Sequence, residues 1–239
     1  MFLEYASLIK ELTLKHVNVK LSDTQVSQFC NFGDLLLEWN QRMNLTRITD
    51  PPEMILKHFI DSMVIAKFIN GTSFADLGTG AGFPGVPLKI LLPELDVVLI
   101  DSLKKRLEFL DVVIKTLNLK KINTVHARAE DFGKNKLYRA QFDTASSRAM
   151  ARLPILLEFA LPVLKVKGTF LALKGAQVDN ELVESQKALK VLGGQLIKVE
   201  HINLGQGADQ RAIVIIRKVK DTPSQYPRKP GTPVKNPII

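Results

Sequence analysis

Between Ser73 and Lys218, short apolar runs alternate with stretches of helical pattern, and this alternation constrains the fold more than any other feature. Each run has the length of a buried strand, and most are followed by room for one helix. Such alternation predicts an α/β fold with a doubly wound, parallel sheet. The runs span 73–77, 96–100, 123–127, 142–146, 168–173, 195–202 and 211–218, and the helical stretches lie near 85–92, 102–117, 130–137, 153–162 and 177–192.

The last two runs are joined differently from the others. Only the glycine-containing segment "NLGQGADQ" separates them, and it has no helical pattern. They should pair as an antiparallel hairpin at or near the edge of the sheet. We therefore expect a seven-stranded, mostly parallel sheet with a final antiparallel strand. This is the plan of the Rossmann-like methyltransferases that depend on S-adenosylmethionine (SAM).

The segments on either side of this region have other patterns. Before it, Ser22 and Gln25 form a capping box, and Asp50 followed by Pro51 marks a second helix start. After it, the tail holds five of the twelve prolines and should be extended, with neither a helix nor a central strand. The predicted division is an N-terminal helical extension (1–70), a SAM-dependent methyltransferase domain (71–218) and a Pro-rich basic C-terminal tail (219–239).

The stretch "FADLGTGAGFPGVPLK", residues 74–89, fits two glycine patterns. One is the dinucleotide pattern G-x-G-x-x-G, and the other is the pattern D-x-G-x-G-x-G that opens many SAM-binding loops. Either lets the backbone approach a ligand closely, although a tight turn without a ligand is a further alternative. The first pattern uses Gly80, Gly82 and Gly85, and the second uses Asp76, Gly78, Gly80 and Gly82.

Three details of this stretch favour SAM over a dinucleotide. The glycines begin directly after the strand, at Gly78, and in that register Phe83 takes the place of the third dinucleotide glycine. Asp76 lies inside the strand, where its carboxylate needs a ligand amine or loop amides as partners. Pro84 and Pro87 remove two amide donors from a turn that would otherwise hold a pyrophosphate, a group that SAM lacks.

Acidic residues follow the second and third strands. Asp101 ends the second strand, where its carboxylate can accept hydrogen bonds from the ribose hydroxyls of a nucleoside cofactor; it can also cap the next helix. In "ARAEDF", residues 127–132, Ala129 and Glu130 are placed to contact an adenine ring, and Asp131 to contact its exocyclic amine. A capped helix start is an alternative interpretation of this segment.

The segment "DTASSRAM", residues 143–150, follows the fourth strand and is informative through what it lacks. It has no [DNS]-P-P-[YF] pattern to clamp an exocyclic amine, and the single cysteine, Cys30, lies on a distant helix. Adenine-N6 and pyrimidine-C5 methylation are therefore disfavoured. Arg148 stands there instead and can bind a carboxylate, a phosphate or guanine O6, or form a surface salt bridge. His58 and Asp61 either border the pocket or form a local surface pair.

Charge and cysteine content limit the compartment and the kinds of partner that the protein can have. The net charge is +9, and the last 23 residues hold six Lys or Arg residues against one Asp, which favours a polyanionic partner. One cysteine excludes an internal disulfide and fits a reducing compartment, and so few Cys and His exclude a Cys-rich zinc site. No apolar run approaches the roughly 18 residues of a membrane span, and we find no signal peptide. We expect a cytoplasmic monomer with no metal and no membrane partner.

Six motifs together resemble one family, the bacterial small-subunit rRNA guanine-N7 methyltransferases of the RsmG or GidB type. The resemblance runs from about residue 20 to 218, and the run "GTGAGFPGVPL" joined to "DSLKKR" is its most specific part. The tail "YPRKPGTPVKNPI" is also similar to that of Gram-positive-like members. The motifs are "NQRMNLTRITDPPEMILKHFIDSM", "DLGTGAGFPGVPLKI", "LIDSLKKRLEFL", "ARAEDF", "SSRAM" and "LALKG".

This resemblance implies a SAM-dependent enzyme that methylates N7 of one guanine in the 530 loop of 16S rRNA, position 527 in the usual numbering. The partner would be 16S rRNA or the small ribosomal subunit. The family's SAM contacts correspond to Gly78, Phe83, Ala129, Glu130 and Arg148, and its ribose-binding acid to Asp101. With Asp76 and Gly80 these residues form the predicted cofactor site, and the predicted RNA contacts are Lys174, Arg228 and Lys229.

The implied chemistry agrees with the residues after the fourth strand. Guanine N7 has an in-plane lone pair and no proton, so the enzyme needs orientation and a dry pocket more than a general base. Arg148 would position the guanine or the cofactor. Three alternatives stay open: a SAM-dependent methyltransferase acting on another RNA or on a small molecule, a non-catalytic RNA-binding protein, and an NAD oxidoreductase.

Overall fold

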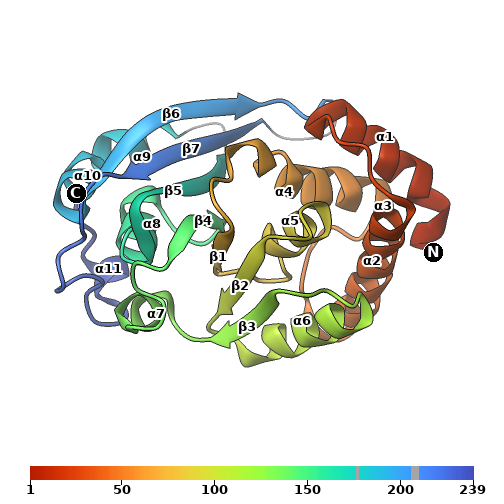
Figure 1. The fold of residues 1–239 in the computed structure, drawn as a ribbon, viewed down its shortest axis with the longest axis horizontal. Coiled ribbons are helices and arrows are strands. Elements are labelled where there is room, and N and C mark those ends of the chain that lie inside the picture. The colour runs from red at the N-terminus through yellow and green to blue at the C-terminus, as the bar shows by residue number, and fades with distance from the viewer. Residues whose placement is uncertain (176–177, 206–209) are drawn as a thin grey trace.

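Seven strands form one sheet in the computed structural model of the chain, which describes residues 1–175, 178–205 and 210–239 (Figure 1). Their order is β3-β2-β1-β4-β5-β7-β6, and β7 is antiparallel to both of its neighbours while the other pairs are parallel. The predicted α/β fold, with its seven strands and its final antiparallel strand, is confirmed. The strands are β1 (Ser73–Leu77), β2 (Asp96–Asp101), β3 (Ile122–His126), β4 (Phe142–Arg148), β5 (Leu164–Gly175), β6 (Gly194–Ile202) and β7 (Arg211–Lys218).

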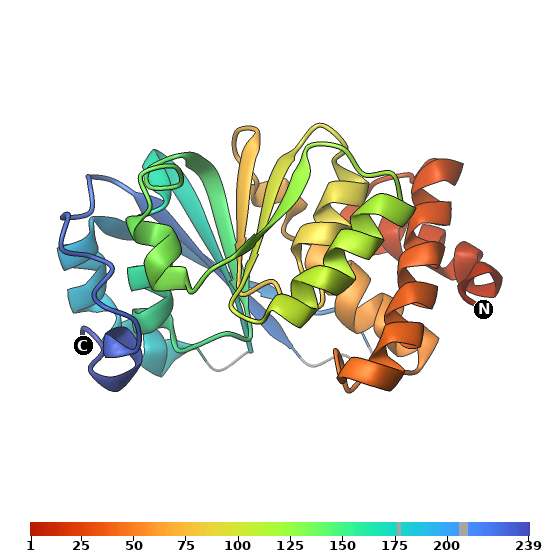
Figure 2. The same ribbon diagram turned by 90° about the horizontal axis from the view of Figure 1, so that it is seen from below.

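Helices cover both faces of the sheet, which gives the molecule three layers (Figure 2). Successive side chains of a strand point to opposite faces, so Phe74 of β1 joins one buried hydrophobic cluster and Ala75 joins the other. The helices α5 (Gly85–Leu91) and α6 (Lys104–Thr116) and those before β1 cover the Phe74 face. The Ala75 face is covered by α7 (Ala129–Lys134), α8 (Leu153–Ala160), α9 (Asp179–Glu184) and α10 (Gln186–Leu192).

The residues before β1 are helical. The predicted capping box is confirmed, since Gln25 N donates to Ser22 Oγ at 3.3 Å and Ser22 N donates to Gln25 Oε1 at 2.9 Å. The predicted start at Asp50 is also confirmed, because its carboxylate accepts from Glu53 N at 3.1 Å. A domain boundary at residue 70 remains a prediction. The segments are α1 (Ala6–Val17), α2 (Asp23–Met43), α3 (Pro51–Met54), a π-helical stretch (Ile55–Ile60), α4 (Asp61–Met63), and short 3-10 helices at Phe2–Tyr5 and Ala66–Phe68.

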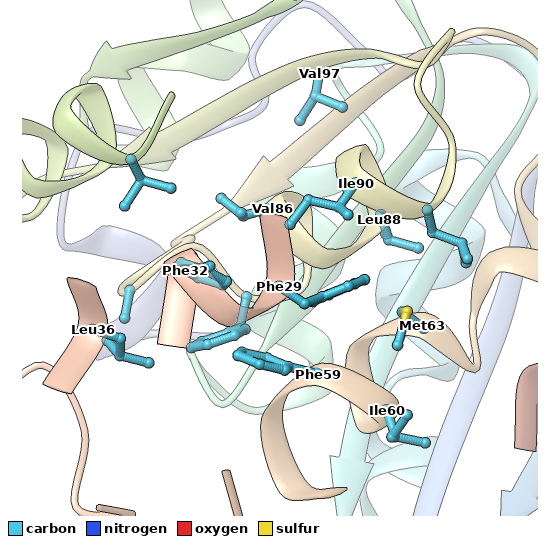
Figure 3. Packing of buried hydrophobic residues seen from close by; sticks show 14 of the residues in the cluster. Phe29, Phe32, Leu36, Phe59, Ile60, Met63, Val86, Leu88, Ile90 and Val97 are labelled. Carbon is cyan, nitrogen blue, oxygen red and sulfur yellow. The ribbon is translucent and has the colours of Figure 1, made fainter. Parts of the chain in front are cut away.

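Aromatic side chains join α2 to the loop after β1. The ring centroids of Phe29 and Phe32 lie 5.3 and 5.5 Å from that of Phe59, and Figure 3 shows the three rings packed together. The ring of Phe32 also lies 5.4 Å from Phe83, and all four side chains are buried. The helices before β1 therefore support Phe83, one of the predicted cofactor contacts.

The tail after β7 is docked on the Ala75 face. Pro227, Pro233 and Ile238 are buried there, and one helical turn, α11 (Thr232–Lys235), lies beside α8 (Figure 1). The prediction that the tail forms no helix is wrong. Pro233 occupies the first turn of α11, where its missing N–H would have had no partner in the helix.

The helix predicted at 177–192 is divided into α9 and α10, with Ser185 between them. Residue 177, and residues 206–209 of the predicted hairpin loop, lie outside the described part of the chain. Among the described helices, we find no segment with the length and hydropathy of a membrane span.

Candidate active site

The order of the strands changes direction at β1, which has β2 on one side and β4 on the other. These strands are parallel, so the loops that follow them meet at the same edge of the sheet. Ligands of open α/β sheets bind at such a switch point. The predicted site residues Gly78, Asp101 and Arg148 lie there, at the ends of β1, β2 and β4.

The loop after β1 depends on glycine for two reasons. Gly78, Gly80 and Gly82 have φ values of +68°, +60° and +96°, in the region that other residues rarely adopt. A Cβ on Gly85 would collide with Leu99 Cδ2, so the close packing of α5 on β2 requires glycine there. Three glycines thus serve the turn and one serves packing, which explains why the stretch matches both glycine patterns.

Asp76 is fully buried beneath this loop. Its Oδ2 accepts from Thr79 Oγ1 at 2.7 Å and from Gly85 N at 2.9 Å, and its Oδ1 accepts from Ser146 Oγ at 3.3 Å. Burial raises the pKa of Asp76 to about 6. A side chain enclosed in this way holds the loop in shape, and Asp76 lines none of the pockets described below. The predicted direct contact between Asp76 and the cofactor therefore needs correction to an indirect role.

Asp101 joins the glycine loop to α6. Gly80 N donates to its Oδ2 at 3.0 Å, Leu103 N donates to its Oδ1 at 2.9 Å, and Arg106 Nη1 lies 3.3 Å from Oδ2. Asp101 also lines a pocket of about 560 Å³. The two roles that the sequence suggested, anchoring the next helix and facing a ligand, are compatible, because each carboxylate oxygen can accept more than one hydrogen bond.

The first residues of α7, Ala129 and Glu130, line the same pocket. Their backbone N–H groups lie in the first turn of the helix, where N–H groups have no acceptor within the helix. They are therefore available to a ligand. Asp131 is exposed and lies outside this lining, which does not fit the predicted contact with an exocyclic amine. A helix does start here, as the alternative interpretation expected, but Arg128 at its N-cap makes no side-chain hydrogen bond to it.

Arg148 ends β4 with its guanidinium both stacked and paired. The guanidinium carbon lies 4.8 Å from the centroid of the Phe83 ring. Nη1 donates to Asp61 Oδ2 at 3.0 Å and to Lys57 O at 3.2 Å, and the side chain is only 17% exposed. Burial lowers the pKa of Arg148, and the charge of Asp61 opposes that shift. The alternative of a surface salt bridge is therefore wrong, because the ion pair lies inside the site.

The ring of His58 also stacks on Phe83, with the two ring centroids 4.7 Å apart. Its Nε2 lies 2.7 Å from Thr46 Oγ1 and its Nδ1 lies 3.2 Å from Lys57 O. A neutral ring with its proton on Nδ1 donates to Lys57 O and accepts from Thr46 at Nε2, and the longer 3.4 Å approach of Arg148 Nη2 to Nδ1 is then not a hydrogen bond. Burial and the charge of Arg148 lower the pKa of His58 to about 3, so the ring is neutral at physiological pH.

Asp61 binds two arginines. Besides Arg148, Arg211 of β7 approaches it, with Nε 3.4 Å from Asp61 Oδ1. Asp61 is 3% exposed. Of the two interpretations of His58 and Asp61, the pocket border is therefore confirmed and the local surface pair is wrong.

Three adjoining pockets follow the edge of the sheet. The first, of about 560 Å³, is lined by Asp101 and Glu130, and the second, of about 200 Å³, lies over Gly80 and Phe83. The third, of about 340 Å³, lies on the far side of Arg148. Neighbouring pockets share residues, so they form one continuous cleft. Gly78 and Arg106 line the first and second, His58 and Arg148 line the second and third, and Ala149 lines all three.

The cleft fits SAM better than a dinucleotide. Gly80 N and Gly85 N donate to carboxylates, and Phe83 N donates to Thr79 O, so these loop amides are not free to hold a pyrophosphate. The carboxylates of Asp101 and Glu130 would also repel phosphate charge. A Cβ on Gly80 would meet only Gly78 O, at 4.0 Å, so the backbone there is open to a close ligand.

Some lining residues were missed by sequence analysis. Arg106 carries a weak signal, since it lies five residues after Asp101 in "DSLKKR", in the first turn of α6. Ala149 has a φ of +53°, which no residue pattern announces. Arg211 and two tail residues, Gly231 and Val234, reach the cleft from far along the chain.

The three predicted RNA contacts have different surroundings. Lys174 lines the third pocket, and its Nζ donates to Ala151 O at 2.9 Å and pairs with Glu181 at 2.8 Å. Lys229 is exposed. The guanidinium of Arg228 is held by the buried carboxylate of Glu158, with Nη2 2.6 Å from Oε2, so the predicted RNA contact at Arg228 does not fit the structure. No group of His, Cys, Asp and Glu within the described residues is arranged to hold a metal ion.

Comparison with solved structures supports the fold. A precorrin-6y C5,15-methyltransferase from Geobacter metallireducens aligns with a TM-score of 0.51 at 13% identity, over 74% of this chain and 92% of that chain. A mutant 16S rRNA (adenine(1408)-N(1))-methyltransferase with cosubstrate SAM, from Catenulisporales acidiphilia, aligns with a TM-score of 0.51 at 14% identity, over 66% and 90%. At such identity these likenesses concern the fold alone.

Comparison with sequences identifies the family. A family model, GidB, described as rRNA small subunit methyltransferase G, matches residues 25–214. Two proteins named ribosomal RNA small subunit methyltransferase G are similar over nearly their whole length. The one from Desulfitobacterium hafniense is 53% identical over 99% of each chain, and the one from Clostridium novyi is 45% identical over 97% of this chain and 96% of its own. The resemblance carried by the six motifs is thus confirmed, and the chain belongs to the rRNA small subunit methyltransferase G family.

Proposed function

We propose that the protein transfers the methyl group of SAM to N7 of one guanine in 16S rRNA, guanine 527 of the 530 loop. The observation that carries the proposal is the continuity of the cleft. Arg148, His58 and Ala149 line both the pocket over the glycine loop and the pocket beyond it, so ligands in the two pockets would adjoin. A transferase needs this arrangement, because donor and acceptor must react with each other directly.

SAM is the methyl donor, and when bound it supplies an electrophilic methyl group on a sulfonium. Asp101 would accept from its ribose hydroxyls, and Ala129 and Glu130 would hold its adenine end. Gly78, Gly80, Phe83 and Arg148 would border the amino-acid end. Asp76 acts through the loop, by fixing Thr79 and Gly85.

The third pocket has the composition that a nucleophile without a proton requires. Among its described lining residues, Lys57 and Lys174 are paired with Glu53 and Glu181, and the other groups that could act as bases are His58 and Asp61. Both nitrogens of His58 have partners, and Asp61 is bound by two arginines. A site without a free base suits guanine N7, whose lone pair attacks without losing a proton.

Arg148 is placed to select guanine. A guanidinium has five N–H donors; Asp61 and Lys57 O are bound through Nη1, and Nη2 lies 3.4 Å from His58 Nδ1. A further N–H directed at guanine O6 would turn the neighbouring N7 toward the second pocket. The cations Lys57 and Lys174 at the same pocket favour a polyanionic substrate, and exposed Lys229 extends the basic surface.

The test is incubation of the protein with labelled SAM and small subunits that lack the modification. We expect label in 16S rRNA at guanine N7, undiminished by an excess of small-molecule metabolites. Label at another atom would contradict the proposal. Transfer to metabolites with no transfer to RNA would instead favour the small-molecule alternative.

The proposed function also bears on the compartment and the oligomeric state of the enzyme. rRNA and its assembling subunits are in the cytoplasm, so we place the enzyme there, and we propose that it acts as a monomer. Sedimentation equilibrium at micromolar concentration tests whether the enzyme is a monomer, because a dimer would give twice the mass of the 239-residue chain.

A further inference from the structure

The C-terminal tail is fastened to the rest of the fold at two points by partly buried polar contacts. Arg139 donates to Thr222 O at 2.8 Å and to Tyr226 O at 2.7 Å, which binds the start of the tail. Arg228 binds Glu158, which is only 1% exposed, through its backbone N at 2.7 Å and through its guanidinium. Charge-assisted bonds to a buried carboxylate are strong, so this part of the tail is held firmly.

Close packing adds to these bonds. A Cβ on Gly133 of α7 would lie 2.7 Å from Pro227 Cγ, so the tail rests directly on the backbone of that helix. Pro233 and Ile238 are buried further along the tail. The segment after Arg228 is thus part of the folded body and has a defined position beside α7.

The position of this segment matters because it reaches the first pocket. Gly231 N donates to Glu130 Oε1 at 2.9 Å, a contact between residues 101 positions apart. Gly231 and Val234 line the pocket together with Asp101, Ala129 and Glu130. Val234 is 60% exposed, so it offers an apolar side chain at the rim of the pocket.

We propose that residues 228–239 complete the adenosine end of the cofactor site. Gly231 fixes the carboxylate of Glu130, and Val234 supplies apolar surface to the adenine ring. Gly231 and Val234 are positioned by the Arg228–Glu158 pair, which makes Arg228 a positioning residue. This inference rests on the proposed function only in taking SAM as the ligand.

The experiment measures binding by calorimetry with two probes, SAM and 5′-methylthioadenosine, which lacks the amino-acid end. We expect V234A to weaken both about three- to tenfold without changing the unfolding temperature, because Val234 is exposed. R228A should weaken both by more, about tenfold or above, and should also lower the unfolding temperature. The matched control is K235A, an exposed residue next to Val234 that does not line the pocket, and it should bind both probes as the unsubstituted chain does.

Unchanged binding of both probes by V234A would overturn the inference, as would unchanged binding by folded R228A. A loss confined to SAM would also overturn it, because a tail at the adenosine end must affect methylthioadenosine equally. These outcomes are independent of the substrate. An unsubstituted chain that binds SAM but methylates something other than guanine N7 would contradict the proposed function and leave this test valid.

Discussion

The two ends of the cleft are held by different kinds of interaction. At the adenosine end, backbone N–H groups of Gly80, Leu103 and Gly231 donate to the carboxylates of Asp101 and Glu130, and the ion pair of Asp101 with Arg106 is partly exposed to solvent. At the acceptor end, which is the third pocket, side-chain charges pair with one another, as Asp61 does with Arg148. Removing one charge of a buried ion pair leaves the other charge unpaired in a low-dielectric interior, which is costly. A backbone N–H group that loses its acceptor can instead form a hydrogen bond with water or with a ligand. The acceptor end should therefore respond more sharply to substitution.

The largest effect is expected for Arg148→Ala. It removes the stacking on Phe83 and the stronger partner of Asp61, so methyl transfer to rRNA should fall by about 100-fold or more. SAM binding should change by less, which steady-state kinetics and calorimetry would separate. Arg148→Lys keeps the charge but not the planar fork, and we expect it to restore folding stability without restoring the rate. Equal losses in SAM affinity and in rate would mean that Arg148 acts only on the cofactor. They would contradict the proposed difference between the two ends of the cleft.

The next effect concerns Asp76, the buried carboxylate beneath the glycine loop. Its pKa is raised from 3.8 to about 6, so between these values the folded chain keeps a proton that the unfolded chain releases. The free energy of unfolding should thus fall by about 2–3 kcal/mol as the pH rises through this window.

Asp76→Asn tests this, because an amide can keep the bonds from Thr79 and Gly85 without titrating. Urea unfolding from pH 4 to 7 should show a flatter profile for D76N than for the unsubstituted chain. Parallel profiles would mean that Asp76 is ionised in the fold without cost, and that this loop is held by charge like the acceptor end.

Asp101→Asn should have an intermediate effect at the adenosine end. The amide keeps one acceptor oxygen for Gly80 or the ribose but loses the charge beside Arg106, so SAM affinity should fall about tenfold. Asp131→Asn, an exposed carboxylate near the same pocket, is the control and should bind SAM normally. A similar loss in both variants would indicate a general electrostatic effect in place of a contact.

The smallest effect is expected for Arg106→Ala. Its side chain is 41% exposed, and its pairing with Asp101 is therefore weakened by solvent. We expect SAM affinity to change by less than about threefold, as measured by calorimetry. A loss as large as that of Asp101→Asn would show that the adenosine end also depends on charge.

Whether a feature could be predicted from the sequence depends on how far apart in the chain its interacting residues lie. Local patterns predicted the strands, the capping box at Ser22 and the glycine turn, because each depends on residues close together in the chain. They placed Asp101, Ala129, Glu130 and Arg148 at strand or helix ends, and these four line the cleft.

The errors lie where distant segments meet. A strand carboxylate such as Asp76 has the same local pattern whether it faces a ligand or is enclosed by Ser146, 70 positions away. Arg228 has the pattern of an exposed cation in a basic tail, yet Glu158 lies 70 positions before it and holds its guanidinium. Neither pairing leaves a periodic signal in the sequence.

The central claim is that SAM at one end of the cleft meets guanine N7 at the other. It is tested most directly by chemical mapping of N7-methylguanine across 16S rRNA from cells that carry either the unsubstituted gene, the R148A variant or no copy. We predict a single modified guanine, at position 527, that is present with the unsubstituted protein and absent or strongly reduced in the other two. An unchanged map in all three, or a protein-dependent methyl group at another atom, would contradict the account.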